Sequence, residues 1–123
     1  MGTTAAQRKA AERINRQVAP WRYRADLEHA IGVAAGRALA HGDAITRAEL
    51  AERTVALLVQ HSNDAAHKLL KARKVRAEDL PPVETMRDEA TDCLQRHFVT
   101  VTDEEDARRR EFDARLAKVT GRA

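Results

Sequence analysis

Residues 46–75, TRAELAERTVALLVQHSNDAAHKLLKARKV, carry the most continuous helical pattern in the chain. Apolar or small residues return every three or four positions, at Leu50, Thr54, Leu57, Leu58, His61, Ala65, Leu69 and Ala72. This period is typical of a helix that buries one stripe of its surface. Thr46 and Glu49 form a capping-box pattern at its start. We therefore predict a long central helix against which the other helices pack.

The run Ser62-Asn63-Asp64 is the weak place in this helix. Short polar side chains bond to nearby backbone groups, and they can cap a new helix instead of continuing the old one. We favour one helix of about 30 residues, which would be roughly 45 Å long. Two helices that meet at Asn63 are the alternative.

Four further helices are expected on either side of this stretch. Their predicted ranges are residues 4–18, 20–41, 82–101 and 102–119. Gly42 is suited to the left-handed position that ends a helix. The expected fold class is therefore all-α, an irregular four- to five-helix bundle around a long central helix.

The last of these helices depends on a second capping-box pattern, formed by Thr102 and Glu105. Phe112, Leu116 and Val119 follow at helical spacing as its apolar points. The preceding β-branched residues 98–102 are also compatible with a local extended segment.

Composition limits the domain count and the size of the core. A chain of 123 residues suits one domain. We predict a single helical domain over residues 1–123, with 1–19 as a basic N-terminal helix or arm and 20–123 as the bundle. Only 3% of the residues are aromatic. Because an alanine-rich core buries little area per residue, we expect self-association to add burial.

Charge and cysteine content suggest where the protein resides. Lys and Arg number 22 against 19 Asp and Glu, a formal net charge of +3. The single cysteine, Cys93, allows no intrachain disulfide, which fits a reducing cytosol. The longest apolar run, residues 30–36, is too short to span a bilayer. We therefore expect a cytoplasmic protein without a membrane segment, and the Arg- and Ala-rich composition suggests a bacterial or phage origin.

Small residues form a line at spacing four in the second predicted helix, at Gly32, Gly36 and Ala40. Such a line lets another helix backbone approach closely. It predicts either close packing within the bundle, which we favour, or a seam for self-association.

Basic residues gather in two places, the first predicted helix with its junction and the end of the central helix. The candidate nucleic-acid contacts are Arg8, Lys9, Arg13, Arg16, Arg22, Arg24, Lys68, Lys71, Arg73, Lys74 and Arg76. Basic side chains neutralise phosphates and release counterions, and exposed aromatics stack on bases. Trp21 and Tyr23 lie within the first group, but Tyr23 also falls on an apolar stripe and Trp21 suits a helix junction. We favour the interpretation that these aromatics are buried and that the arginines around them are solvated.

Two carboxylate–histidine pairs stand at a spacing that helical bundles use for metals. They are Asp26 with His29 and Asp64 with His67. No full set of inward carboxylates and histidines accompanies them, so we predict no metal and no cofactor.

Cys93 is the one candidate nucleophile, with His97 a turn later. A thiol on an apolar stripe is inert when buried, so packing is the expected role. His61 and His97 fall near predicted buried stripes and are expected at the edge of the core.

Taken together, these patterns predict a non-enzymatic helical interaction protein. It is expected to be an adaptor, assembly or regulatory component that binds itself as a homo-oligomer or binds another protein. The alternative is a DNA- or RNA-binding regulator that uses the basic N-terminal helix and the 68–76 cluster.

Overall fold

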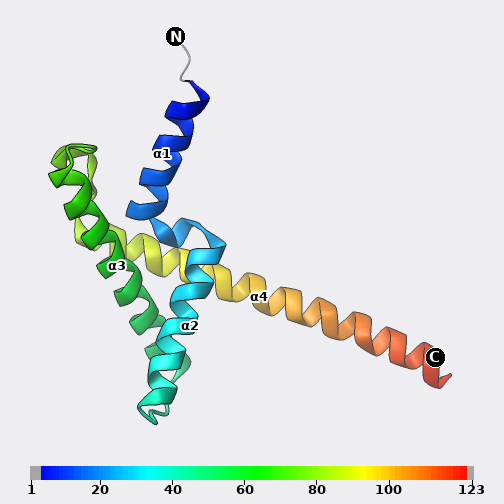
Figure 1. Cartoon of the computed structure of the whole chain (residues 1–123). Coiled ribbons are helices and arrows are strands. Elements are labelled where there is room, and N and C mark those ends of the chain that lie inside the picture. Colours follow the sequence, from blue (N-terminus) through cyan, green and yellow to red (C-terminus); the bar gives the residue numbers. More distant parts are fainter. Residues whose placement is uncertain (1–3, 122–123) are drawn as a thin grey trace.

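The computed structural model describes residues 4–121, and within this range the chain is all-α. Four α-helices and two short 3-10 turns follow one another, and no strand occurs among these residues. The predicted segment 1–19 begins outside the described residues, and the predicted segment 20–123 ends outside them. Helices α2, α3 and the first half of α4 pack together, whereas α1 and the rest of α4 project from them (Figure 1).

Helix α1, Ala5–Val18, begins at a complete capping box. The backbone N–H of Gln7 donates to Thr4 Oγ1 at 3.1 Å, and the Thr4 N–H donates to Gln7 Oε1 at 2.9 Å. The helix contains no fully buried residue, and its half-buried side chains are Ile14 and Val18. A thin apolar edge therefore holds α1 against α3.

The junction after α1 differs from the single helix 20–41 that the sequence predicts. Pro20–Arg22 forms a 3-10 turn with Pro20 at its first position, and Tyr23 is extended at φ −115° and ψ 126°. Helix α2 then covers Arg24–Ala40. The predicted helix is wrong over its first four residues, because the extended Tyr23 separates the proline turn from α2.

Helix α2 ends as the sequence predicts, at a glycine in the left-handed region. Gly42 has φ +70°, and the Asp43 N–H donates to the Ala38 carbonyl at 2.9 Å. This six-residue closure satisfies a carbonyl that would otherwise lack a partner at the helix end.

Helix α3, Arg47–Lys71, is one continuous helix of 25 residues. The prediction of an unbroken central helix is confirmed and the break at Asn63 is wrong, but the helix ends at Lys71 and not at Val75. Thr46 caps it by accepting a hydrogen bond from the Glu49 N–H at 3.1 Å. Ser62 is fully buried, and its hydroxyl donates to the Val18 carbonyl. The polar residue at the expected weak point thus ties α3 to the end of α1.

The buried stripe of α3 is rotated from the predicted one. Its buried residues are Thr54, Val55, Leu58, Val59, Ser62, Ala66 and Leu69. His61 and Ala72 are exposed, contrary to the prediction, while Leu50 and Ala65 are half-buried. The apolar run 55–59 covers more than one face, so its period alone leaves the phase of the stripe undecided.

Helix α4, Val83–Thr120, replaces the fourth and fifth predicted helices with one of 38 residues. It follows a 3-10 turn at Ala77–Asp79. The Thr102 hydroxyl donates to the Phe98 carbonyl at 2.8 Å, a bond inside a helix, and therefore does not cap a new one. The predicted boundary at Thr102 and the extended alternative over 98–102 are both wrong.

The core lies where the turn at Pro20–Arg22 and helices α2, α3 and α4 meet. Trp21 and Leu94 are each 1% exposed and are its largest fully buried side chains. Trp21 fills the helix junction, the role that its position predicts. The described helices include none that is both long enough and apolar enough to cross a membrane.

Candidate interaction surfaces

Two arginines, one in the Pro20–Arg22 turn and one at the start of α2, form ion pairs with α4. Arg22 Nε lies 2.5 Å from Glu89 Oε1, and both guanidinium ends of Arg24 contact Glu104, at 2.8 and 2.9 Å. Arg24 also bonds to Glu28 at 2.8 Å. These pairs fix the point at which α4 leaves the body of the protein.

The two α4 carboxylates are stabilised in their charged form. The hydrogen bond from Arg22 lowers the pKa of Glu89, although partial burial opposes this effect. The hydrogen bond from Arg24 likewise lowers the pKa of Glu104. These two hydrogen bonds therefore favour the ionised form of both carboxylates.

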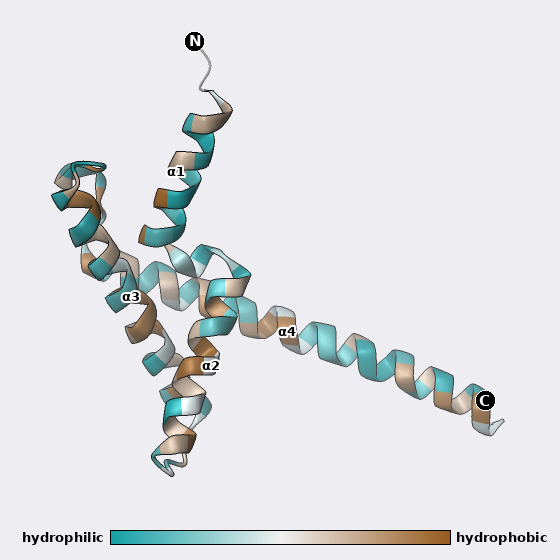
Figure 2. Cartoon of the chain, in the orientation of Figure 1, coloured by the Kyte–Doolittle hydropathy of each residue, from teal (hydrophilic) through white to brown (hydrophobic). Residues whose placement is uncertain are grey.

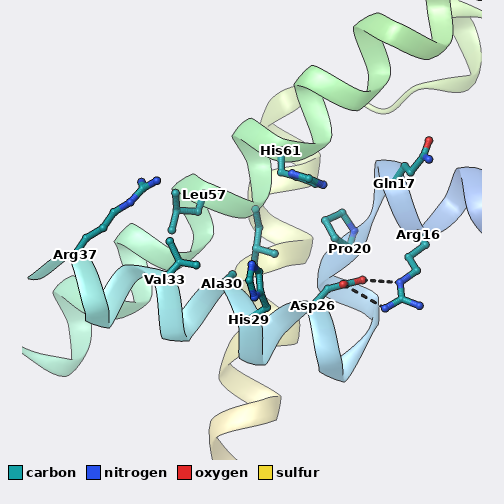
Figure 3. Close-up of a pocket in the computed structure, with 11 residues that line it drawn as sticks. Arg16, Gln17, Pro20, Asp26, His29, Ala30, Val33, Arg37, Leu57 and His61 are labelled. Carbon is teal, nitrogen blue, oxygen red and sulfur yellow. Dashed lines mark hydrogen bonds and ion pairs between the residues drawn. The ribbon is translucent and has the colours of Figure 1, made fainter.

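A cleft of about 480 Å³ opens between the end of α1, the Pro20 turn, α2 and α3 (Figure 3). Its apolar side chains are Pro20, Ala30, Val33, Leu57 and Leu58. Its polar side chains are Arg16, Gln17, Asp26, His29, Arg37 and His61. A cleft of this size with an apolar floor and a few polar groups is typical of a binding surface.

The charges in the cleft are unevenly compensated. Arg16 Nε lies 3.0 Å from Asp26 Oδ2 and its guanidinium carbon lies 5.5 Å from the centre of the Tyr23 ring. At the opposite end, Arg37 forms no ion pair with any residue between 4 and 121, and Figure 3 shows it beyond Leu57. The cleft therefore presents one internally neutral pair and one free positive charge.

The predicted metal pairs do not converge into a site. Asp26 bonds to Arg16, while His29 and His67 are exposed. Within the described part of the chain, no three side chains among His, Cys, Asp and Glu lie close enough together to hold a metal ion.

Cys93 is half-buried on α4, in a shallow depression beside Trp21 and Arg22. Arg96 Nη2 donates to its Sγ at 3.5 Å. His97 is half-buried too and lies against Phe98, with 6.3 Å between ring centres. His97 thus lies at the edge of the core as the sequence predicts, whereas His61 does not.

The end of α4 is the most exposed helical segment of the molecule. Beyond Glu104, residues 105–120 of α4, here named the α4 arm, project away from the other helices (Figure 1). Phe112 is 64% exposed, Leu116 49% and Val119 84%, and all three share one face at helical spacing. Figure 2 shows these hydrophobic turns near the C-terminal end of a mostly hydrophilic arm.

The predicted nucleic-acid contacts fall into two groups. Arg16, Arg22 and Arg24 bond to carboxylates of the same chain, and Arg76 lies 3.9 Å from Asp79. The remaining candidates form no ion pair with the described residues, and these are Arg8, Lys9, Arg13, Lys68, Lys71, Arg73 and Lys74. They lie on α1, on the last turn of α3 and in the turn that follows α3.

The small-residue line of α2 faces away from the bundle. Gly32, Gly36 and Ala40 are exposed, and a Cβ added to either glycine would meet no atom within 4 Å. The favoured prediction of close packing within the bundle is therefore wrong, while self-association stays a prediction.

Sequence reasoning placed Phe112, Leu116 and Val119 on one helix face but expected them to pack within the bundle. It predicted no partner for Arg37 or for Glu104. The partner of such a residue can lie on a helix far away in the sequence, as the ion pair between Arg24 and Glu104 shows.

Comparisons of the chain with family models, with curated proteins and with solved structures give no match.

Proposed function

We propose that this chain is a non-enzymatic helical interaction protein that associates with itself, and that the α4 arm is its docking element. The observation that carries the proposal is the exposure of Phe112, Leu116 and Val119 on one face of a projecting helix. Helices derive most of their stability from packing an apolar face. An arm that leaves three apolar side chains in water therefore gains stability from a partner.

The position of the arm supports the same proposal. Arg24 holds Glu104 by two hydrogen bonds at the base of the arm, so the arm leaves the body in a defined direction. A docking helix that is held in one direction before binding loses less freedom when it binds.

Sedimentation velocity of the full chain over a wide concentration range tests the proposal. We expect the mass to rise above 13.7 kDa with concentration. Phe112→Asp should keep the helical circular dichroism and lower the mass to that of the monomer. Val99→Asp is the matched control, because Val99 is 62% exposed on α4 but lies outside the arm. A wild-type protein that stays monomeric at every concentration would refute self-association.

We propose nucleic-acid binding as the second candidate function. It is supported by the basic side chains on α1, at the end of α3 and just after it that form no ion pair with the described residues. Helix α1 and this end of α3 extend toward the same side of the molecule in Figure 1. Such side chains give affinity that falls steeply with salt. The test is fluorescence anisotropy with labelled single- and double-stranded oligonucleotides at low salt.

In that experiment, Lys9→Glu/Arg13→Glu should weaken binding and reduce its salt dependence. Arg47→Glu, which reverses an exposed charge at the start of α3, is the control. Equal anisotropy with and without the wild-type protein would rule out this function.

A further inference from the structure

Helix α1 and the end of α3 form a fork with positively charged prongs. The prongs are residues 4–18 and residues 62–76, and together they are here named the basic fork. They are joined at the base, where the buried Ser62 hydroxyl donates to the Val18 carbonyl. From this joint both prongs extend toward the same side of the molecule (Figure 1).

Basic side chains stand at matched distances from the joint on the two prongs. Arg13 and Lys9 lie five and nine residues before the last residue of α1. Lys68 and Lys71 lie six and nine residues after Ser62 on α3. Because a helix rises about 1.5 Å per residue, each prong carries positive charge at about 8 Å and about 14 Å from the joint. All four side chains are exposed.

The acidic side chains around the fork do not cancel its charge. Besides the seven basic side chains of the fork that form no ion pair with the described residues, three carboxylates of residues 4–18 and 62–79 form none, those of Glu12, Asp64 and Glu78. The start of α4, which lies beside the end of α3, adds one basic and two acidic side chains, Arg87, Glu84 and Asp88. Eight basic against five acidic side chains leave an excess of +3, which equals the formal net charge of the whole chain.

The prongs contain no Phe, Tyr or Trp on which a base could stack. Of the aromatics next to α1, Trp21 is 1% exposed, and Tyr23 is half-buried with the Arg16 guanidinium over its ring. Proteins that bind single strands without sequence preference combine positive charge with aromatic stacking platforms. A fork of basic side chains alone instead suits a duplex, whose two strands present one phosphate charge about every 1.7 Å of axis.

The α4 arm is the other place where arginines gather, and it lacks this excess of charge. Arg108, Arg109 and Arg110 stand among six acidic side chains in residues 103–113. The exposed Phe112 lies next to them, but the arm projects in a different direction from the fork (Figure 1).

We propose that the basic fork binds double-stranded nucleic acid through its phosphates, with both prongs on one duplex and without preference for sequence. Contacts to phosphates position a protein on a duplex but carry no sequence information. This inference rests on the second proposed function, and it names the kind of nucleic acid and the surface that binds it.

Two double variants separate the prongs. Lys9→Gln/Arg13→Gln removes two charges from α1, and Lys68→Gln/Lys71→Gln removes two from α3. All four positions are exposed and glutamine is a good helix former, so the helical circular dichroism should not change.

Arg37→Gln/Arg47→Gln is the matched control. It also removes two exposed charges that form no ion pair with the described residues. Arg47 stands 21 residues before Lys68, about 31 Å away along α3.

Fluorescence anisotropy with a labelled duplex over a range of salt concentrations measures the contacts of each prong. Each phosphate contact contributes about 0.9 to the slope of log affinity against log salt, so each prong variant should reduce the slope by about 1.8 and the combined variant by about 3.6. At the lowest salt, each prong variant should raise the dissociation constant by about tenfold or more, and the control should leave it unchanged. A second duplex of unrelated sequence should bind equally well, and a single strand of the same length about tenfold more weakly.

The outcomes distinguish this inference from the second proposed function. If only one of the two prong variants reduces the slope, binding by both prongs is refuted while nucleic-acid binding stands. Tighter binding of single strands, or a difference of about tenfold between the two duplexes, refutes the inference in the same way. A wild-type protein that binds no oligonucleotide refutes the inference and the second proposed function together.

Discussion

Replacing Arg73 by glycine should give a more stable protein than replacing it by alanine, although both changes remove the same charge. Arg73 has φ +56° and is the one residue other than glycine with a positive φ in the described part of the chain. It occupies the left-handed position that ends α3, where the Lys74 N–H donates to the Leu69 carbonyl at 2.9 Å. Glycine is the usual residue at such a position, because it has no Cβ to clash with the backbone.

The expected magnitude follows from three terms. The left-handed conformation costs an L-residue about 1–2 kcal/mol. Glycine also loses more backbone freedom on folding than other residues, which offsets about 0.5–1 kcal/mol of the stabilisation. Loss of the positive charge at a helix C-terminus costs roughly 0.3–1 kcal/mol. Arg73→Ala loses the same charge but keeps the strain, so Arg73→Gly should exceed Arg73→Ala in free energy of unfolding by about 0.5–1 kcal/mol.

Urea denaturation followed by circular dichroism at pH 7 measures this difference. Both variants lack the arginine, so their comparison isolates the backbone effect. Equal free energies of unfolding, or a more stable alanine variant, would show that the left-handed conformation at Arg73 is not strained. In the oligonucleotide experiment both variants should behave alike, because they remove the same charge from the 68–76 cluster.

Three other perturbations have defined outcomes. Leu94→Ala removes a side chain that is 1% exposed and should cost about 3 kcal/mol of unfolding free energy in urea denaturation, against little effect from Val99→Ala at an exposed position of the same helix. Ser62→Ala leaves the Val18 carbonyl without its hydrogen-bond donor and should lower the free energy of unfolding by about 1–2 kcal/mol. In this variant amide hydrogen exchange should be faster in α1 than in α2, and equal exchange in the two helices would contradict this role. Glu89 and Glu104 have folded-state pKa values below their unfolded ones, so their stabilisation is complete above the unfolded pKa of about 4.5 and is lost as the pH falls through the folded values. The thermal midpoint of Arg22→Gln/Arg24→Gln should therefore change less on acidification than that of the wild type, and an unchanged acid dependence would show that these pairs do not contribute.

The sequence predicted the end of a helix correctly where a single capping residue determines that end. Thr46 accepts the bond that its capping pattern predicts, and Gly42 adopts the left-handed conformation expected after a helix. Thr102 shows the limit of such signals, because the same hydroxyl that caps a helix start also bonds to the carbonyl four residues earlier within a helix. Which of the two occurs depends on whether the preceding residues are helical already.

Periodicity predicted which segments are helical but not which face is buried. In α3 the run 55–59 is apolar on more than one face, so the neighbouring helices decide its orientation. Ser62 shows the result, since a polar residue occupies the buried face and His61 lies on the rim of the cleft.

The α4 arm explains why the candidate site was harder to predict than the fold. Phe112, Leu116 and Val119 repeat at the spacing of a core stripe, and the sequence assigns such a stripe to the interior. Among residues 4–121, none covers these three side chains. A stripe that a second molecule covers has the same pattern as one covered within the chain, because burial stabilises both in the same way. The distinction lies in the length of the unbroken helix, which carries the stripe beyond the reach of its own bundle.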